Sequence, residues 1–289
     1  MPFLLRYPDW KQEGLDWPHR ADSRFVRTRR HRWHIQRAGQ GQKVLLLHGT
    51  GASVHSWADL FSRLKADFEV LSLDLPGHGF TRTDALRFSS VEAMTEDIAD
   101  LLHSEEFSPE LVIGHSAGAV LASNLAITGA VSPVRVISIN GAYEPFPGLV
   151  GAIAPVMAKA LYYNPLMAIT FASSAKNRKR VEGLIEQTGS VVPVSSVDAY
   201  AALLQCSGHV SGALGMMAHW NLADVSKAVA QTKVPHLFLV GDQDKAVPPL
   251  VSEKLANTMP HADVQRLAGL GHLLHEEDPE TVAAVIRKG

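Results

Sequence analysis

The pentapeptide Gly114-His115-Ser116-Ala117-Gly118 is the segment of this sequence best suited to covalent chemistry. It matches G-x-S-x-G and lies between an apolar run typical of a buried strand and a small-residue run typical of a helix. The glycines allow a sharp turn that lifts the serine hydroxyl above a sheet. The following helix start would offer positive potential and free N–H groups to an anion. A chance match is the alternative, but the strand–turn–helix context favours a nucleophilic serine.

A nucleophilic serine needs a base and a carboxylate that orients the base. His272 follows one predicted strand and precedes the last predicted helix, so we expect it to be the base. His275, in the next turn, is expected to pack or cap locally. Asp242 and Asp244 both follow the predicted strand HLFLV, and local sequence alone leaves either of them open as the acid.

An oxyanion hole is predicted from a second Gly-rich turn, His48-Gly49-Thr50-Gly51, which follows an earlier apolar run. In such a site one N–H comes from the residue after the nucleophile, here Ala117, and another from an earlier loop. We expect Thr50 or Gly51 to supply the second N–H group. His48 is expected to brace this loop from within the protein.

The elements that must position these residues alternate between strands and helices along most of the chain. Such alternation implies right-handed crossovers and a mainly parallel sheet that is covered on both faces. A hairpin with basic residues on its solvent face is predicted over 24–37. The other predicted strands cover 43–49, 69–77, 111–116, 134–140, 236–244 and 262–269.

The alternation stops near residue 141 and resumes near 221, which predicts a helical cap inserted between two strands of the sheet. We therefore expect a core of 1–140 with 221–289, and a cap of 141–220 that lies over the strand ends. For Tyr162, Met216 and Met217, ordinary packing within the cap is the default interpretation. The residues expected to line a substrate pocket are His115, Met157, Tyr162, Met216 and Met217.

The composition is that of an ordinary globular protein, with 46% hydrophobic and 19% charged residues and a formal net charge of −2. This charge gives no electrostatic reason to bind nucleic acid. The single cysteine, Cys206, cannot form an internal disulfide, and His and Cys show no zinc spacing, so we expect neither a metal nor another cofactor.

We expect a cytoplasmic protein, because the first residues lack the basic start and apolar run of a signal peptide. Residues 111–134 contain no charge, but the GHSAG turn divides them into a strand and a helix rather than a membrane span. The apolar runs 145–158 and 160–175 lie beside the basic stretch KNRKR. That arrangement leaves open peripheral contact with a membrane or a biosynthetic complex.

Taken together, LLLHGTGAS, LDLPGHG, VIGHSAGA, LVGDQDKAVPP and GLGHLLHEEDPE resemble the α/β-hydrolase superfamily over nearly the whole chain. The resemblance implies a mostly parallel eight-stranded sheet with helices on both faces and an inserted cap. It also implies a serine hydrolase, because epoxide hydrolases and haloalkane dehalogenases carry Asp at the position of Ser116. The superfamily pattern G-x-x-D-x-x-V-P selects Asp244 over Asp242 as the acid.

A closer resemblance is carried by the arms and the cap, in PDWKQEGLDWPHRADSRFV, RWHIQRAGQG, NGAYEPFPG and GALGMMAHWNL. These segments resemble the α/β-hydrolase-like proteins found with bacteriochlorophyll biosynthesis genes, which are labelled magnesium-chelatase accessory proteins. The resemblance implies a phototrophic bacterium and a hydrophobic substrate such as a tetrapyrrole ester. A non-catalytic accessory factor that binds a tetrapyrrole or a protein is the alternative function.

Overall fold

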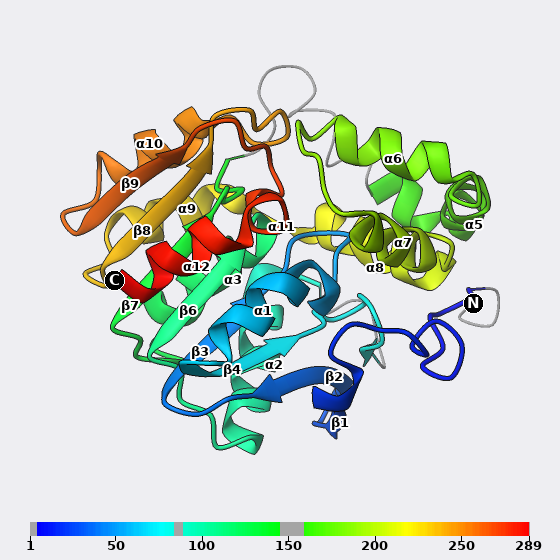
Figure 1. Cartoon of the computed structure of the whole chain (residues 1–289), viewed down its shortest axis with the longest axis horizontal. Coiled ribbons are helices and arrows are strands. Elements are labelled where there is room, and N and C mark those ends of the chain that lie inside the picture. Colours follow the sequence, from blue (N-terminus) through cyan, green and yellow to red (C-terminus); the bar gives the residue numbers. More distant parts are fainter. Residues whose placement is uncertain (1–4, 84–88, 145–158, 289) are drawn as a thin grey trace.

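One mixed sheet forms the centre of the computed structural model, which describes residues 5–83, 89–144 and 159–288. Its strands run in the order β1-β2-β4-β3-β6-β7-β8-β9, and β5 pairs with β2 (Figure 1). β2 is antiparallel to β1, β4 and β5, whereas all other neighbours are parallel. The strands are β1 Ser23–Arg27, β2 His31–Ala38, β3 Gln42–Leu47, β4 Phe68–Leu73, β5 Arg82–Thr83, β6 Leu111–His115, β7 Arg135–Ile139, β8 His236–Gly241 and β9 Ala262–Leu267.

This topology confirms the predicted α/β-hydrolase fold, with one difference in the number of strands. The described chain forms nine strands where eight were expected, because the two-residue β5 pairs with the start of β2. So short a segment carries no alternation of apolar and polar residues that a sequence pattern could reveal. The hairpin expected over 24–37 is formed by β1 and β2.

The central strands are continuous apolar runs because helices cover both faces of the sheet. In β3, Leu45 and Leu47 belong to one apolar core, whereas Val44 and Leu46 belong to the other. The first core includes residues of α2, α3, α9 and α10, and the second includes residues of α1, α11 and α12. These helices are α1 Ala58–Leu64, α2 Val91–Ser104, α3 Ala117–Ile127, α9 Leu222–Ala230, α10 Pro249–Ala256, α11 Leu274–Glu277 and α12 Pro279–Lys288.

Between β7 and β8 the chain leaves the sheet and forms a group of helices to one side of it (Figure 1). Among the described residues of the predicted insertion 141–220, four helices from α5 to α8 are assigned, and α9 then returns to pack on α3. We call this group the cap. Its helices are α5 Pro165–Ser174, α6 Arg178–Glu186, α7 Val194–Leu204 and α8 Ser207–His219.

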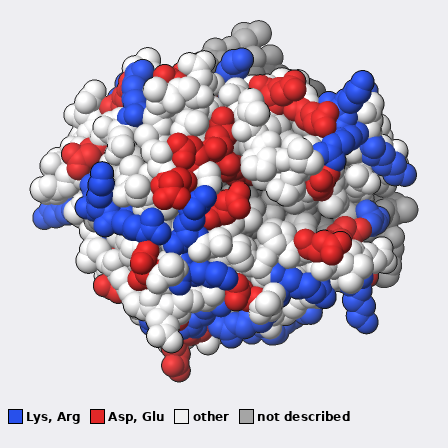
Figure 2. Space-filling view, viewed as in Figure 1, with Lys and Arg blue, Asp and Glu red and all other residues white. Residues whose placement is uncertain are grey.

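Charges of both signs are interleaved on the molecular face shown in Figure 2, which agrees with the small net charge of −2. The charge-free run 111–134 contains β6 and α3, which end and begin on either side of Ser116. Among the described ranges, there is no helix with the length and hydropathy needed to span a bilayer.

Candidate active site

Ser116 occupies the turn between β6 and α3 in a strained conformation, with φ 52° and ψ −114°. A positive φ is uncommon for a residue other than glycine and is often found at functional sites. The neighbouring glycines are required by close packing. A Cβ at Gly114 would lie 2.2 Å from the Gly118 carbonyl oxygen, and one at Gly118 would lie 2.0 Å from the Leu47 carbonyl oxygen. The turn therefore depends on glycine at both positions.

Asp244, rather than Asp242, lies against His272. The Nδ1 atom of His272 is 2.8 Å from Oδ2 of Asp244, and the Asp244 side chain is fully buried. Oδ1 of Asp244 accepts hydrogen bonds from the backbone N–H groups of Ala246 and Val247, each at 2.8 Å. Asp242 is exposed, and its carboxylate accepts from the Gly269 N–H group instead. The carboxylate of Asp244 thus fixes the orientation of the His272 ring, with the proton on Nδ1.

The loop that carries His272 is held in place by two side chains from the neighbouring strand ends. Nε2 of His115 and Nδ2 of Asn140 both donate to the His272 carbonyl oxygen, each at 2.9 Å. Asn140 also accepts from the Gly241 N–H group at 2.9 Å, so it links the ends of β7 and β8 to this loop. The backbone of His272 is therefore positioned as firmly as its ring.

His115 was expected to line the substrate pocket, and the structure places it elsewhere. Its ring is 2% exposed and packs between the rings of His272 and His275, outside the cavity wall. Burial holds the pKa of His115 well below its usual value, so the ring is neutral near pH 7. His115 belongs to β6, whose two faces are both covered, and its side chain therefore points into the protein.

The connection between α6 and α7 of the cap contacts the loop that carries Asp244 and the loop that carries His272. The Thr188 carbonyl oxygen accepts from the N–H groups of Lys245, at 3.1 Å, and His272, at 3.3 Å. Ser190 Oγ accepts from the Leu273 N–H group at 2.8 Å. Thr188 and Ser190 thus connect the cap to the loop that carries Asp244 and to the loop that carries His272.

The loop of residues 49–52 follows β3 and lies beside Ser116. We call it the oxyanion loop because the sequence predicts that it contributes to an oxyanion hole. Thr50, Gly51 and Ala117 all line the same cavity as Ser116. Their backbone N–H groups make no hydrogen bond to any residue of the described ranges. Free N–H groups at a cavity wall are the feature that can stabilise a developing oxyanion. The structure leaves both Thr50 and Gly51 available for this role.

His48 holds the oxyanion loop in place through two hydrogen bonds of its ring. Nδ1 of His48 donates to the Gly49 carbonyl oxygen at 2.8 Å, and Nε2 accepts from the Leu75 N–H group at 2.9 Å. Both bonds require a neutral ring with the proton on Nδ1. His48 is fully buried, and burial lowers its pKa, which keeps the ring neutral. His48 thus connects the loop after β3 to the loop after β4.

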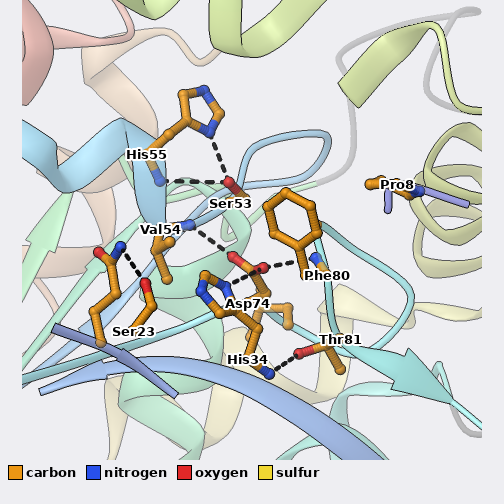
Figure 3. Close-up of polar contacts among 12 residues, drawn as sticks. Pro8, Ser23, His34, Ser53, Val54, His55, Asp74, Phe80 and Thr81 are labelled. Carbon is orange, nitrogen blue, oxygen red and sulfur yellow. Dashed lines mark hydrogen bonds and ion pairs between the residues drawn. The ribbon is translucent and has the colours of Figure 1, made fainter. Parts of the chain in front are cut away.

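Asp74 is the centre of a second set of contacts in the loop after β4 (Figure 3). Its carboxylate accepts from the backbone N–H groups of Val54 and Phe80, each at 2.8 Å. His34 Nδ1 lies 2.8 Å from the same carboxylate. Burial by itself raises the pKa of Asp74, but the contact with His34 and the hydrogen bond from the Val54 N–H group lower it to about 2. The carboxylate therefore ties β2, β4 and the segment after the oxyanion loop together.

A cavity of about 1170 Å³ lies between the cap and the carboxyl ends of the strands. It is larger than the roughly 300–1,000 Å³ of an ordinary small-molecule site. Ser116 and His272 both line it, as do Met216 and Met217 of α8, and most of its wall is apolar. The other apolar residues of the wall include Leu161, Met167, Phe171, Leu184, Leu204, Val210, Leu214, Trp220, Leu222, Val247, Leu250 and Val251.

Tyr162, another residue expected in the pocket, is not found in this wall. Tyr162 packs against the rings of Tyr163 and His219, which agrees with the interpretation of ordinary packing within the cap. Met157 lies outside the described residues. Glu144, Arg180 and Lys254 also line the cavity, and of these only Arg180 was noted from the sequence, as part of the basic stretch KNRKR.

His275 packs in the interior, as its sequence position suggested. Its side chain is fully buried against Trp57 and His115, and burial lowers its pKa to about 3. Within the described ranges, no group of three or more His, Cys, Asp or Glu side chains is arranged to hold a metal ion.

The sequence did not predict that four residues support the loops of the site through hydrogen bonds, namely Asp74, Asn140, Thr188 and His209. Asp74 and Asn140 directly follow β4 and β7, and a polar residue after an apolar run was the available signal, although both residues fell inside the predicted strands 69–77 and 134–140. Thr188 and His209 belong to the cap, and their contacts with the core depend on how the cap folds back over the sheet. Sequence spacing carries no signal for such contacts.

Comparisons with known proteins identify the family of this chain. The model of the "Alpha/beta hydrolase family" matches residues 44–285. A "Magnesium-chelatase 30 kDa subunit" of Rhodobacter capsulatus is 36% identical over 273 residues, which cover 94% of this chain and 95% of that protein. A "Pimeloyl-[acyl-carrier protein] methyl ester esterase" of Vibrio atlanticus is 25% identical over 236 residues, or 80% of this chain and 86% of that protein.

Two solved structures show the same fold at low sequence identity. An alpha/beta hydrolase fold protein from Burkholderia ambifaria is 19% identical, with a TM-score of 0.76 over 92% of this chain and 97% of that one. An esterase from Exiguobacterium antarcticum is 16% identical, with a TM-score of 0.72 over 89% and 95% of the two chains. The chain therefore belongs to the alpha/beta hydrolase family and, as its arms and cap suggested, to the same branch as the Rhodobacter capsulatus magnesium-chelatase 30 kDa subunit.

Proposed function

We propose that this protein is a serine hydrolase that cleaves esters of bulky hydrophobic compounds. The observation that carries the proposal is the contact between His272 and the buried carboxylate of Asp244, at the wall of a cavity that Ser116 also lines. A neutral histidine with its Nδ1 proton donated to a carboxylate leaves Nε2 free to accept a proton. This is the protonation state that a general base for a serine requires.

In the proposed mechanism, Ser116 Oγ attacks the ester carbonyl carbon while His272 Nε2 takes the hydroxyl proton. The carbonyl oxygen becomes an oxyanion, which the N–H groups of Ala117 and of Thr50 or Gly51 stabilise. Asp244 stabilises the imidazolium but stays ionised. The C–O bond then breaks, the imidazolium gives its proton to the leaving alcohol, and an acyl-enzyme remains. Water, activated by His272 in the same way, releases the acid and restores Ser116.

The cavity supports a large and mainly apolar substrate. Its wall is apolar, and its volume of about 1170 Å³ exceeds that of a typical small-molecule site of up to roughly 1,000 Å³. The relatives include an esterase named for a methyl ester and a subunit named for magnesium chelatase. A tetrapyrrole ester of bacteriochlorophyll biosynthesis would satisfy both the size and these two relationships.

An ester panel tests this function. We expect turnover of p-nitrophenyl esters to rise with acyl length, and we expect hydrolysis of a porphyrin methyl ester. Both activities should be lost in Ser116→Ala, with the thermal stability of the folded protein retained. Turnover that persists in Ser116→Ala would refute the assignment of Ser116 as the nucleophile.

A non-catalytic tetrapyrrole-binding accessory function is the second candidate. The name of the 36%-identical relative, a magnesium-chelatase subunit, favours it. Titration of a free porphyrin into Ser116→Ala, followed by tryptophan fluorescence quenching, separates the two candidates. Tight binding together with no ester turnover by the wild type would favour the accessory function, since a scaffold needs the cavity but not the serine.

A further inference from the structure

His209 is part of the cap, yet both of its ring nitrogens bond to loops of the core. Nδ1 accepts a hydrogen bond from the Gly79 N–H group, and Nε2 donates to the Gly51 carbonyl oxygen, each at 3.0 Å. The side chain is fully buried, and burial lowers its pKa to about 4. Because one partner can only donate and the other only accept, the ring is neutral with its proton on Nε2.

Together with His48, this contact places Thr50 between two restrained carbonyl groups. The Gly49 carbonyl oxygen accepts from His48 Nδ1, at 2.8 Å, and from the Ala52 N–H group, at 3.2 Å. In a trans peptide the following N–H group points opposite to the carbonyl, so these bonds set the direction of the Thr50 N–H group. The Gly51 carbonyl on the other side of Thr50 is held by His209.

The oxyanion loop needs such restraint because glycines flank Thr50 on both sides. Gly51 has φ 78°, and a Cβ there would meet nothing within 4 Å, so the surrounding packing does not fix its backbone. Glycine can rotate between several backbone conformations at little cost. Donors stabilise an oxyanion well only when they are already oriented before the reaction.

Helix α8 can act as a fixed support because it packs tightly on the core. A Cβ at Gly212 would lie 2.0 Å from the Gly77 carbonyl oxygen. The Gly208 N–H group donates to the Arg6 carbonyl oxygen at 2.7 Å. Near the C-terminal end of α8, Met216 Sδ accepts a hydrogen bond from Thr50 Oγ1 at 3.0 Å. Two residues of α8, His209 and Met216, therefore contact the oxyanion loop directly.

We infer that His209 is a positioning residue of the oxyanion hole, through which the cap orients the peptide N–H groups that receive the substrate's developing charge. The inference rests on the serine hydrolase function proposed above and deepens it. It gives the cap a role in the chemical step as well as in substrate binding. His209 is not among the residues that line the cavity, whereas Gly51 is, so the effect of His209 on the substrate passes through Gly51.

Two amide substitutions separate the two bonds of the ring. In His209→Gln the side-chain NH₂ can reach the position of Nε2 and donate to Gly51, whereas Gly79 loses its acceptor. In His209→Asn the carbonyl can accept from Gly79, whereas Gly51 loses its donor. Each variant thus keeps one bond and loses the other, so a purely structural role predicts similar losses of stability for both.

The measurements are kcat and KM for a p-nitrophenyl ester, together with hydrogen exchange of the segment 49–52 followed by mass spectrometry. We expect His209→Asn to lower kcat by about tenfold or more, short of the roughly 100- to 1,000-fold loss for deleting an oxyanion donor. KM should change little, and His209→Gln should stay close to the wild type. In His209→Asn, exchange within 49–52 should accelerate at the Ala52 N–H group, which donates to the Gly49 carbonyl oxygen. Equal kcat losses and equal exchange rates in the two variants would overturn the inference.

The exchange measurement also keeps the inference separate from the proposed function. If the wild type hydrolyses no ester, the proposed function fails, and the exchange rates of the two variants still decide whether His209 holds the loop. Faster exchange in His209→Asn alone supports the positioning role. Indistinguishable exchange in the Asn and Gln variants contradicts it.

Discussion

Glu276 provides a quantitative test of the contact between cap and core. Its carboxyl group is 4% exposed and accepts a hydrogen bond at 2.8 Å from the Tyr200 hydroxyl of cap helix α7. Burial raises the pKa of Glu276 from 4.5 to about 8, so the carboxyl group is neutral in the folded protein at pH 7. In the unfolded chain the same group ionises near pH 4.5.

The sign and size of the effect follow from proton linkage. The folded state binds the proton more tightly, so this group leaves stability unchanged below pH 4.5 and lowers it progressively as the pH rises towards 8. A shift from 4.5 to about 8, at about 1.4 kcal/mol per unit, amounts to roughly 4–5 kcal/mol above pH 8. In Glu276→Gln the side chain keeps its size and an acceptor for Tyr200, but it cannot ionise.

Urea unfolding of the wild type and of Glu276→Gln at pH 5, 7 and 8.5 measures this difference. Near pH 5 we expect the two proteins to agree within about 1–2 kcal/mol, the usual cost of an imperfectly paired buried amide. At pH 8.5 the variant should be the more stable by several kcal/mol. Glu280→Gln serves as the control, because Glu280 is 66% exposed in its ion pair with Arg63. If wild type and Glu276→Gln lose stability in parallel from pH 5 to pH 8.5, the neutral buried carboxyl group is ruled out.

Three further predictions concern packing, the loop that carries His272 and acid stability. Gly212→Ala should lower the free energy of unfolding by about 1–3 kcal/mol, because its Cβ would meet the Gly77 carbonyl oxygen. Gly183→Ala in α6 has open space around its Cβ and should raise the free energy of unfolding by about 0.5–1 kcal/mol, and thermal unfolding of both variants checks this. Asn140→Asp replaces the two N–H···O bonds to Gly271 and His272 with carboxylate–carbonyl contacts, so we expect at least about 2 kcal/mol less stability and slower ester turnover, with exposed Asn257→Asp unchanged. Burial lowers the pKa of His55 and His275 to about 3 and of His209 to about 4, so the unfolded chain takes up these protons first as the pH falls below 6.5. At about 1.4 kcal/mol per unit for each group, the three together should remove about 4 kcal/mol per pH unit near pH 5, which outweighs the opposing contribution of about 1.4 kcal/mol from Glu276. Unfolding free energies that do not decrease between pH 6 and pH 5 would contradict this last prediction.

The fold was predictable from the sequence because parallel strands covered on both faces are continuous apolar runs. Val44 to Leu47 and Leu111 to Ile113 are such runs, and each ends in a Gly-containing turn. The exception was β5, whose two residues form a strand only because β2 lies beside them. Local patterns thus identified the elements that are long enough to bury a full face.

The candidate site was predictable where the chemistry depends on local spacing, and less so where it depends on tertiary contacts. The turn around Ser116 requires glycine at fixed positions, so its sequence carries the signal. Asp242 and Asp244 are equivalent by local sequence. The superfamily pattern favoured Asp244, and the structure directs the Asp244 side chain towards His272. His115 appeared suited to the pocket by its position beside Ser116, but the alternation of side chains along β6 turns it into the interior. The contact of His209 with Gly51 joins residues 158 positions apart, beyond the reach of any local pattern.

The most direct test of the proposed catalytic group is the rate of labelling by a fluorophosphonate probe, which reacts with an activated serine whatever the natural substrate. A catalytic arrangement of Ser116, His272 and Asp244 predicts rapid labelling of the wild type and none of Ser116→Ala. In Asp244→Asn the amide would donate to His272 Nδ1 and place the proton on Nε2, so we expect labelling at least about 100-fold slower. Asp242→Asn, the matched control two residues away, should label at the wild-type rate. Unlabelled wild type, labelled Ser116→Ala, or equal rates for Asp244→Asn and Asp242→Asn would each contradict the assignment.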